Sequence, residues 1–205
     1  MQNIYTIPML LSIFSFAFAM VMTPGPNNIM MLSSGLTFGY RRTLPHLLGV
    51  MIGFPVMVMA IGFGLGSLFE QFPLLLTVLK YVGITYLLWM AWHIAHATGG
   101  YDTEPNSNDK PFTFIQAAMF QWVNPKAWMM AITSVSSFVT HAEQAIIQIS
   151  IISGIFLLCG IISTNSWTLG GVLLKRFIRN AKSIQRFNIA MAILIVVSIL
   201  PFVFG

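Results

Sequence analysis

Six long apolar segments constrain what this chain can fold into more than any other feature. They lie at about 5–39, 44–66, 72–95, 112–140, 145–173 and 187–204. A membrane-spanning helix needs about 20 mostly apolar residues. The composition agrees, because 57% of the 205 residues are hydrophobic and only 7% are charged, against about 25% charged in an ordinary soluble domain. The sequence therefore predicts an all-α polytopic membrane protein with six transmembrane segments.

Proline interrupts the first and the fourth segments at equivalent points. The first carries Thr23-Pro24-Gly25-Pro26-Asn27-Asn28, and the fourth carries Asn124-Pro125-Lys126. A proline inside a helix removes a backbone donor and clashes with the preceding turn. A single helix over 5–39 would also reach about 52 Å, well beyond a hydrocarbon core of about 30 Å. We therefore expect the first and fourth helices to be discontinuous.

Paired breaks of this kind carry a functional meaning. Broken backbone at membrane depth is tolerated where it is buried in protein or lines a cavity, and matching breaks in two halves of a transporter point to its substrate site. A polar linker at 98–111 divides the chain into halves at 1–97 and 112–205, each with three segments. Since three crossings is an odd number, the second half enters from the opposite side. The sequence thus predicts two inverted three-helix repeats.

The basic residues give the orientation. Most of the ten Lys and Arg residues fall on one side if the segments alternate: Arg41, Arg42, Lys110, Lys175, Arg176, Arg179, Lys182 and Arg186. The loops of the other side hold none, so the positive-inside rule places the 98–111 linker in the cytoplasm and both termini outside. These cations form no stripe with aromatic residues on a soluble face, which argues against a nucleic-acid partner.

Two further cations, Lys126 and Lys80, fall inside apolar segments. A charge near mid-membrane costs about 2.5–3.5 kcal/mol on insertion scales, so we expect Lys126, beside the second break, to hold a substrate carboxylate. The alternative is that it neutralises a partner or snorkels along a cavity. Lys80, about 12 Å deep, could instead snorkel to the outer interface. Asn165, in a polar run that begins at Ser163, faces either the site or a neighbouring helix.

The breaks themselves complete the expected site. A helix N-terminus offers free N–H groups and about half a positive charge, so Asn27 and Asn28 could receive a carboxylate, or their amides could cap their own backbone. Unwound carbonyls around Gly25 could receive an ammonium group, and the whole suits a small zwitterion. The expected substrate-binding residues are Thr23, Pro24, Gly25, Pro26, Asn27, Asn28, Asn124, Pro125, Lys126, Asn165 and Lys80.

Little in the sequence supports catalysis or cofactor chemistry. The lone Cys159 excludes an internal disulfide or a Cys-x-x-Cys redox pair, and no catalytic triad or carboxylate pair lies at span depth. The methionines share no ligand spacing with the histidines, and Met more often fills packing gaps. We expect no enzyme activity, no cofactor and no metal. Because no acidic residue lies deep in a span, proton coupling would use His46, His93, a lysine or the substrate itself.

The chain resembles the LysE/RhtB family of bacterial amino-acid exporters over essentially its whole length. The resemblance rests on Thr23-Pro24-Gly25-Pro26-Asn27-Asn28, Gly39-Tyr40-Arg41-Arg42, Gly49-x-x-x-Gly53, Lys80-Tyr81-Val82-Gly83 and Asn124-Pro125-Lys126. The branch it looks closest to is the cysteine/O-acetylserine exporters, through Asn27-Asn28, Gln121-x-x-Asn124 and Asn165-x-Trp167. Carried over from the family, the functional positions would be Pro24, Pro26, Asn27, Asn124, Pro125 and Lys126.

This resemblance implies export of amino acids or close derivatives across the bacterial inner membrane, driven by the proton motive force. We expect a secondary transporter for small neutral amino acids of the cysteine or O-acetylserine type, working by proton antiport. Homoserine, threonine or branched-chain amino acids are the alternative substrates. An intramembrane enzyme or a structural subunit are the alternatives outside transport. The expected partners are the substrate and membrane lipid, and a chain this small could also pair as a homodimer.

Overall fold

The computed structural model describes residues 4–65, 71–96, 110–175, 177 and 181–204, and every regular element in these ranges is helical. The elements are α1 (Ile7–Met22), α2 (Pro26–Phe38), α3 (Tyr40–Ala60), η1 (Ile61–Leu65), α5 (Pro73–His96), α6 (Phe114–Phe120), η2 (Gln121–Val123), α7 (Pro125–Phe138), η3 (Ala142–Gln144), α8 (Ala145–Leu174) and α9 (Ala181–Phe204). The expected all-α class is confirmed. The predicted 98–111 linker lies outside the described residues except at Lys110 and Pro111.

Four helices in the described ranges are long and apolar enough to cross a membrane: Tyr40–Leu65, Thr77–His96, Ala142–Leu174 and Lys182–Leu200. A fifth span is present if α1 and α2, which are bent by 54° at their junction, count as one broken span. The chain is thus a multi-pass membrane protein. The sixth span and the inverted repeats stay predictions.

The first and fourth apolar segments are discontinuous, as expected. α1 ends at Met22 and α2 begins at Pro26, while η2 ends at Val123 and α7 begins at Pro125. The final helix starts at Ala181, whereas the apolar segment was expected from about 187. The first turns of the helix are polar and carry Lys182 and Arg186, so hydropathy alone did not include them. Long basic side chains are favoured at a membrane interface, so the helix extends beyond the apolar stretch.

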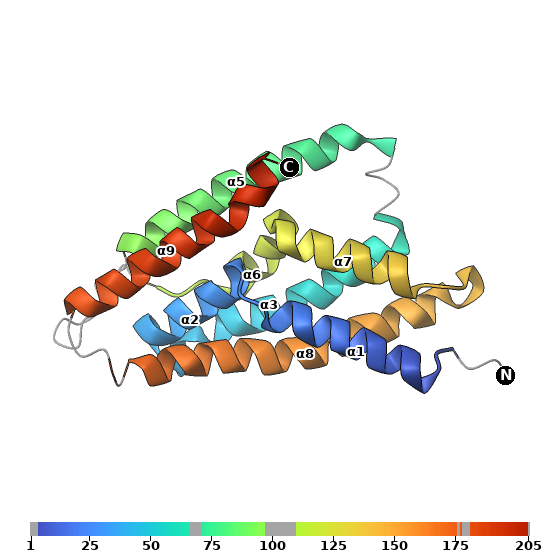
Figure 1. Cartoon of the computed structure of the whole chain (residues 1–205), viewed down its shortest axis with the longest axis horizontal. Coiled ribbons are helices and arrows are strands. Elements are labelled where there is room, and N and C mark those ends of the chain that lie inside the picture. Colours follow the sequence, from blue (N-terminus) through green and yellow to red (C-terminus); the bar gives the residue numbers. More distant parts are fainter. Residues whose placement is uncertain (1–3, 66–70, 97–109, 176, 178–180, 205) are drawn as a thin grey trace.

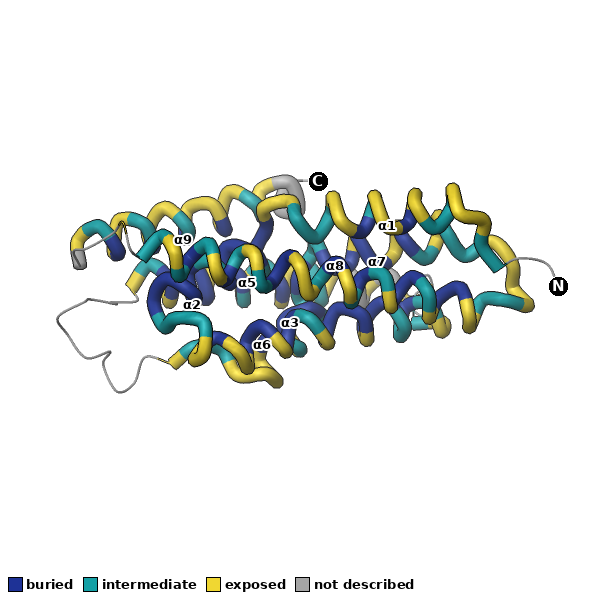
Figure 2. The backbone as a smooth tube through the Cα atoms, turned by 90° about the horizontal axis from the view of Figure 1, so that it is seen from below, coloured by how far each residue is buried: buried dark blue, intermediate teal, exposed yellow. Residues whose placement is uncertain are grey.

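Figure 1 shows that the helices lie mainly along the long axis of the molecule, with α5 and α9 side by side along one edge. The pair formed by α1 and α2 runs away from the end that holds the N-terminus, and α8 packs along both of them as well as along α3. Exposed positions face outward on α1, α5 and α9 and buried positions face the interior (Figure 2). Outward apolar faces are what a lipid environment requires.

Two main apolar clusters form the interior, and each broken segment contributes to both of them. The first cluster joins α1, α3, α7 and α8, with Phe54 and Phe156 among its buried members. The second joins α2, α5, α6 and α9, with Met30 and Phe120 among its members. Because α1 and α7 belong to one cluster while α2 and α6 belong to the other, both breaks fall at the boundary between the clusters.

Close helix contacts hold α3 in place beside the second broken segment. The Gly49-x-x-x-Gly53 spacing predicts such a contact, and it is made with α6: a Cβ added to Gly53 would lie 2.8 Å from the Cα of Ala118. A Cβ on Gly49 would meet the carbonyl oxygen of Phe114. The two glycines therefore allow α6 to lie directly on α3, which positions the turn that leads into the second break.

Candidate functional site

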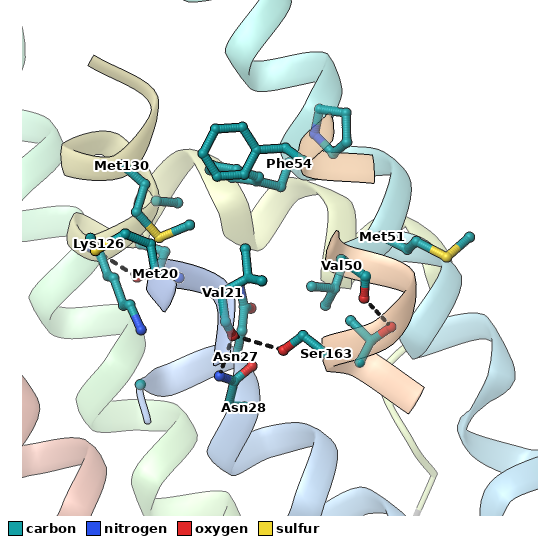
Figure 3. A pocket seen from close by; sticks show the side chains of 17 residues that line it. Met20, Val21, Asn27, Asn28, Val50, Met51, Phe54, Lys126, Met130 and Ser163 are labelled. Carbon is teal, nitrogen blue, oxygen red and sulfur yellow. Dashed lines mark hydrogen bonds between the residues drawn. The ribbon is translucent and has the colours of Figure 1, made fainter. Parts of the chain in front are cut away.

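The first break frees backbone carbonyls at the end of α1, and side chains from elsewhere bind them. The Asn28 amide donates to the carbonyl oxygens of Val21, at 2.7 Å, and of Thr23, at 2.9 Å. The Ser163 hydroxyl, from α8, donates to the same Val21 oxygen at 2.7 Å. Figure 3 shows Asn28 and Ser163 both directed at Val21. A freed carbonyl in an apolar environment is costly unless it is paired, so these bonds stabilise the break.

Lys126 links the second break to the first. Its ammonium group donates to the carbonyl oxygen of Thr23 at 2.6 Å and to that of Pro24 at 3.4 Å. A cation is favourable there, because the C-terminal end of α1 carries about half a negative charge. A Cβ on Gly25 would lie 2.8 Å from Cδ of Lys126. A larger residue at this position would therefore displace the lysine side chain.

The second break is held by its own neighbours in sequence. The Asn124 side chain accepts from the backbone N–H of Lys126 at 3.1 Å, which caps α7. The indole N–H of Trp128 donates to the Trp122 carbonyl at 2.8 Å. A Cβ on Gly83 would meet the Val123 carbonyl oxygen, so α5 also lies directly against this turn.

A pair of amides forms a second link between the breaks. The Asn27 amide donates to Oε1 of Gln121 at 2.8 Å, and the Gln121 amide donates back to Oδ1 of Asn27 at 3.3 Å. Gln121 also donates to the Ala117 carbonyl at 2.9 Å and is fully buried. The start of α2 is therefore tied to the turn that precedes α7.

Two cavities meet at these links. One of about 220 Å³ is lined by both breaks, with Thr23, Pro24, Gly25, Pro26, Asn124, Pro125, Lys126, and apolar residues such as Leu87 and Met129. A smaller one of about 50 Å³ lies beside Asn27, Asn28, Ser163 and Lys126 (Figure 3). The described residues lining them include no acidic side chain. Two helix N-termini and one lysine supply positive charge, and the Thr23 and Pro24 carbonyls supply the negative side.

Most of the residues predicted from sequence line these cavities, and two do not. Asn165 accepts from the Tyr40 hydroxyl at 2.6 Å and donates to the Ile161 carbonyl at 2.7 Å, so its amide joins α8 to α3. That is the interhelical alternative considered for it. Lys80 is half-buried on α5, one turn before Gly83, and lines neither of the two cavities.

Sequence reasoning missed four polar residues at this location: Ser163, Thr164, Gln121 and Ser198. Ser163 belongs to the same polar run as Asn165, and two residues along a helix are 200° apart, so the helix register decides which one faces α1. Gln121 stands within one turn of the Asn-Pro pair, and its place before a break was a usable signal. Ser198, on α9, lines the larger cavity and has no sequence signal, because it stands alone in an apolar helix.

The arrangement matches the needs of a small zwitterion. Helix N-termini and an ammonium group bind a carboxylate, and paired backbone carbonyls bind an ammonium. A volume of about 220 Å³ lies below the roughly 300–1,000 Å³ of sites for drug-sized ligands.

Comparison with known proteins identifies a family and several named relatives. The family LysE type translocator matches residues 18–205. The cysteine/O-acetylserine efflux protein of Salmonella choleraesuis (strain SC-B67) is 34% identical over 190 residues, which cover 92% of this chain and 95% of that protein. The protein of the same name from Shigella flexneri is 33% identical over 195 residues, again 92% and 95% of the two chains. No solved structure matches the chain.

These matches define the class of protein first: a transporter of the membrane rather than an enzyme. The chain belongs to the LysE type translocator family, and the resemblance read from its motifs is confirmed.

Proposed function

We propose that this chain exports small neutral amino acids or their derivatives, of the cysteine and O-acetylserine type, across the bacterial inner membrane. Membership of the LysE type translocator family and the names of the relatives support amino-acid export. The observation that carries the proposal is the contact of Lys126 with the Thr23 and Pro24 carbonyls, because it joins the two broken helices beside a cavity of about 220 Å³.

The substrate binds by exchange with Lys126. Its carboxylate is received by the N-termini of α2 and α7 and by the Lys126 ammonium, and its own ammonium is received by the carbonyls of Thr23 and Pro24. Lys126 donates to those carbonyls in the structure, so the substrate ammonium replaces the lysine there while the carboxylate draws it away. Binding thereby loosens one link between the breaks, and that change is what a rocking motion of the two halves needs.

The remaining residues of the site have supporting roles. Pro24, Gly25, Pro26 and Pro125 keep the helices open, because each disfavours a continuous helix. Asn28 and Asn124 hold the freed backbone groups, and Asn27 carries the amide link to Gln121. Lys80 and Asn165 stand outside this arrangement, and a direct role for them in substrate binding is the least supported part of the predicted set.

The wider architecture follows from the same reasoning. Six crossings arranged as two inverted repeats would place the two breaks at equivalent depth, and the basic residues favour a cytoplasmic 98–111 linker with both termini in the periplasm. Proton antiport would drive export against the gradient. A homodimer stays a prediction of the sequence.

The cavity lining favours a small, uncharged side chain. Its apolar members, Met20, Leu87, Met129 and Ile199, and the absence of an acidic residue among its described lining residues, disfavour lysine or arginine as substrates. Cysteine and O-acetylserine also appear in the names of the relatives. Homoserine and threonine, or the branched-chain amino acids, are the alternative candidates, since they too are neutral.

The test is uptake of labelled cysteine, O-acetylserine, threonine, leucine and lysine into inside-out vesicles that contain the protein, with and without a proton gradient. We expect gradient-dependent uptake of cysteine and O-acetylserine and none of lysine. Uptake of threonine or leucine instead would change the proposed substrate and leave the proposed binding mechanism unchanged. Absence of uptake of all five, with the protein correctly inserted, would refute amino-acid export.

A further inference from the structure

A third cavity, of about 520 Å³, opens between α2, α3, α5 and the start of α6. We call it the vestibule and define it by Thr37, His46, Trp89, His93, Lys110 and Phe112 among its lining residues. It lies at the ends of α2 and α5 and the start of α6, next to the linker expected to be cytoplasmic. Neither the breaks nor Lys126 line it, so it is separate from the site described above.

Two buried side chains in the vestibule lack hydrogen-bond partners among the described residues. The Thr37 hydroxyl is one, and both ring nitrogens of His46 are the other. Thr37 is 7% exposed and His46 is 1% exposed. The His46 ring lies 5.2 Å from the ring of Phe112. Buried polar groups are nearly always paired, so a buried group with no partner calls for an explanation.

Neighbouring polar groups of the vestibule are paired, which makes these two stand out. Ser33 donates to Asn188 at 3.1 Å, and Ser34 shares a hydrogen bond of 3.0 Å with Thr43. The lining residues that the structure describes include the cation Lys110 and no acidic side chain. The Thr37 hydroxyl and the one N–H of a neutral His46 ring are thus unpaired donors in a cavity that Lys110 also lines. A carboxylate is a ligand that accepts from such donors and is attracted by the lysine.

The vestibule and the breaks lie on one helix. Pro26 and Asn27 line the break cavities, and Met30, Ser33, Ser34 and Thr37 line the vestibule farther along α2. From Asn27 to Thr37 the helix rises about 15 Å. Met30 also belongs to the second apolar cluster, so an apolar layer adjoins both chambers. A small solute that passes along α2 would meet the vestibule first from the linker end.

We propose that the vestibule is a second binding site, which receives the carboxylate of an amino acid at Thr37 and His46, with Lys110 nearby, before the substrate reaches the breaks. The role of the vestibule as the first binding site on the export route rests on the proposed function. The binding itself does not, because the orphaned groups would bind a carboxylate whether or not transport follows. The two are therefore tested by separate measurements.

The binding test uses His93→Cys as a reporter, because His93 is exposed and lines the vestibule. The rate at which an anionic thiol reagent modifies this cysteine is measured with and without O-acetylserine. The native Cys159 is fully buried, so the parent chain gives the background. We expect O-acetylserine to slow modification at least threefold, and to do so equally when Lys126→Ala removes the lysine of the breaks.

Variants in the same reporter chain assign the effect to the named groups. Thr37→Val keeps the shape and removes the hydroxyl, and it should abolish the protection, while Thr37→Ser should retain it. Ser150→Ala, which removes a hydroxyl bonded to the Ile146 carbonyl on α8 outside the vestibule, is the control and should leave the protection unchanged. Protection that is absent, or that is lost with Lys126→Ala, would overturn the vestibule as an independent site.

Transport supplies the second readout. In inside-out vesicles Thr37→Val should raise the KM for labelled O-acetylserine about threefold or more with an unchanged maximal rate, because only the first contact is weakened. An unchanged KM would overturn the role on the export route. Absence of uptake by the parent chain, with the reporter still protected, would refute the proposed function and leave the binding site standing.

Discussion

The two breaks do the same thing to the backbone and are stabilised in opposite ways. At the second break, Asn124 caps the following helix and Trp128 binds the Trp122 carbonyl, so the groups involved lie within a few residues of one another. At the first break, Lys126 and Ser163 reach the freed carbonyls of Val21, Thr23 and Pro24 from elements more than 100 residues away. Among the described donors to these three carbonyls, Asn28 alone is local.

This difference assigns different parts to the two breaks. A turn whose capping bonds lie within it keeps its shape when its surroundings move, and the second break depends on α2 only through the link between Gln121 and Asn27 described above. A turn that depends on side chains from other helices changes when those helices shift. We therefore expect the second break to act as the fixed support and the first to respond to the substrate, with Lys126 as the contact that is made and broken.

Replacement of Lys126 should have the largest effect. Lys126→Ala removes both the link to the first break and the charge for the carboxylate, so export should fall about 100-fold, equivalent to about 2.7 kcal/mol. Uptake of labelled O-acetylserine into inside-out vesicles measures it, with insertion checked separately. Lys126→Met keeps a side chain of similar length without the charge. It should be equally inactive if the charge, rather than the size of the side chain, is what export needs. Near-normal uptake by either variant would remove Lys126 from the site.

A comparison of the two asparagines tests the stability of the breaks directly. Asn28→Ala removes two hydrogen bonds, to the Val21 and Thr23 carbonyls. At about 0.5–1.5 kcal/mol for each bond, the variant should lose about 1–3 kcal/mol of stability. Asn124→Ala removes one helix cap and should cost about 1 kcal/mol. Thermal unfolding of the purified variants measures both. A larger loss for Asn124→Ala would reverse the assignment of the fixed and the responsive break.

The sequence was sufficient for the parts of this structure that are determined locally. Apolar length predicted the long helices, and proline with glycine predicted where α1 and α6 give way to α2 and α7, because both residues act on their own backbone. The Gly49 and Gly53 spacing predicted a close contact, although not with which helix. Lys126 stood out because a charge within an apolar segment is rarely without a purpose.

What the sequence could not supply depends on how distant segments pack. Lys126 was predicted to bind a substrate carboxylate. Its contact with the carbonyls of the first break could not be predicted, because that contact depends on the relative placement of the two halves. Asn165 was the predicted site residue of its polar run, but the register of α8 turns Ser163 toward α1 and Asn165 toward Tyr40. The vestibule arises from four separate chain segments and has no signature in any one of them.

Gly25→Ala sharpens the comparison without changing charge. The backbone at Gly25 is extended, with φ at −176°, so alanine can adopt its conformation, and the cost comes from the Cβ that would press on Lys126. Displacing the lysine should lower export about tenfold, or about 1.4 kcal/mol. Gly154→Ala is the control, because a Cβ there meets nothing within 4 Å and export should not change. Equal export by the two variants would show that the lysine position is unimportant.

The smallest expected effect belongs to the amide link between Asn27 and Gln121. In membrane proteins a hydrogen bond between helices contributes about 0.6 kcal/mol on average, and this pair forms two such bonds. A double-mutant cycle with Asn27→Ala and Gln121→Ala isolates the coupling between them, whether measured by thermal unfolding or by uptake.

If the pair only holds the breaks together, the coupling energy will be the same in both measurements. If it opens during transport, the coupling will appear in unfolding and vanish from the maximal rate, because the bond is then absent from the state that limits export. A coupling near zero in unfolding would mean that Lys126 alone connects the two breaks.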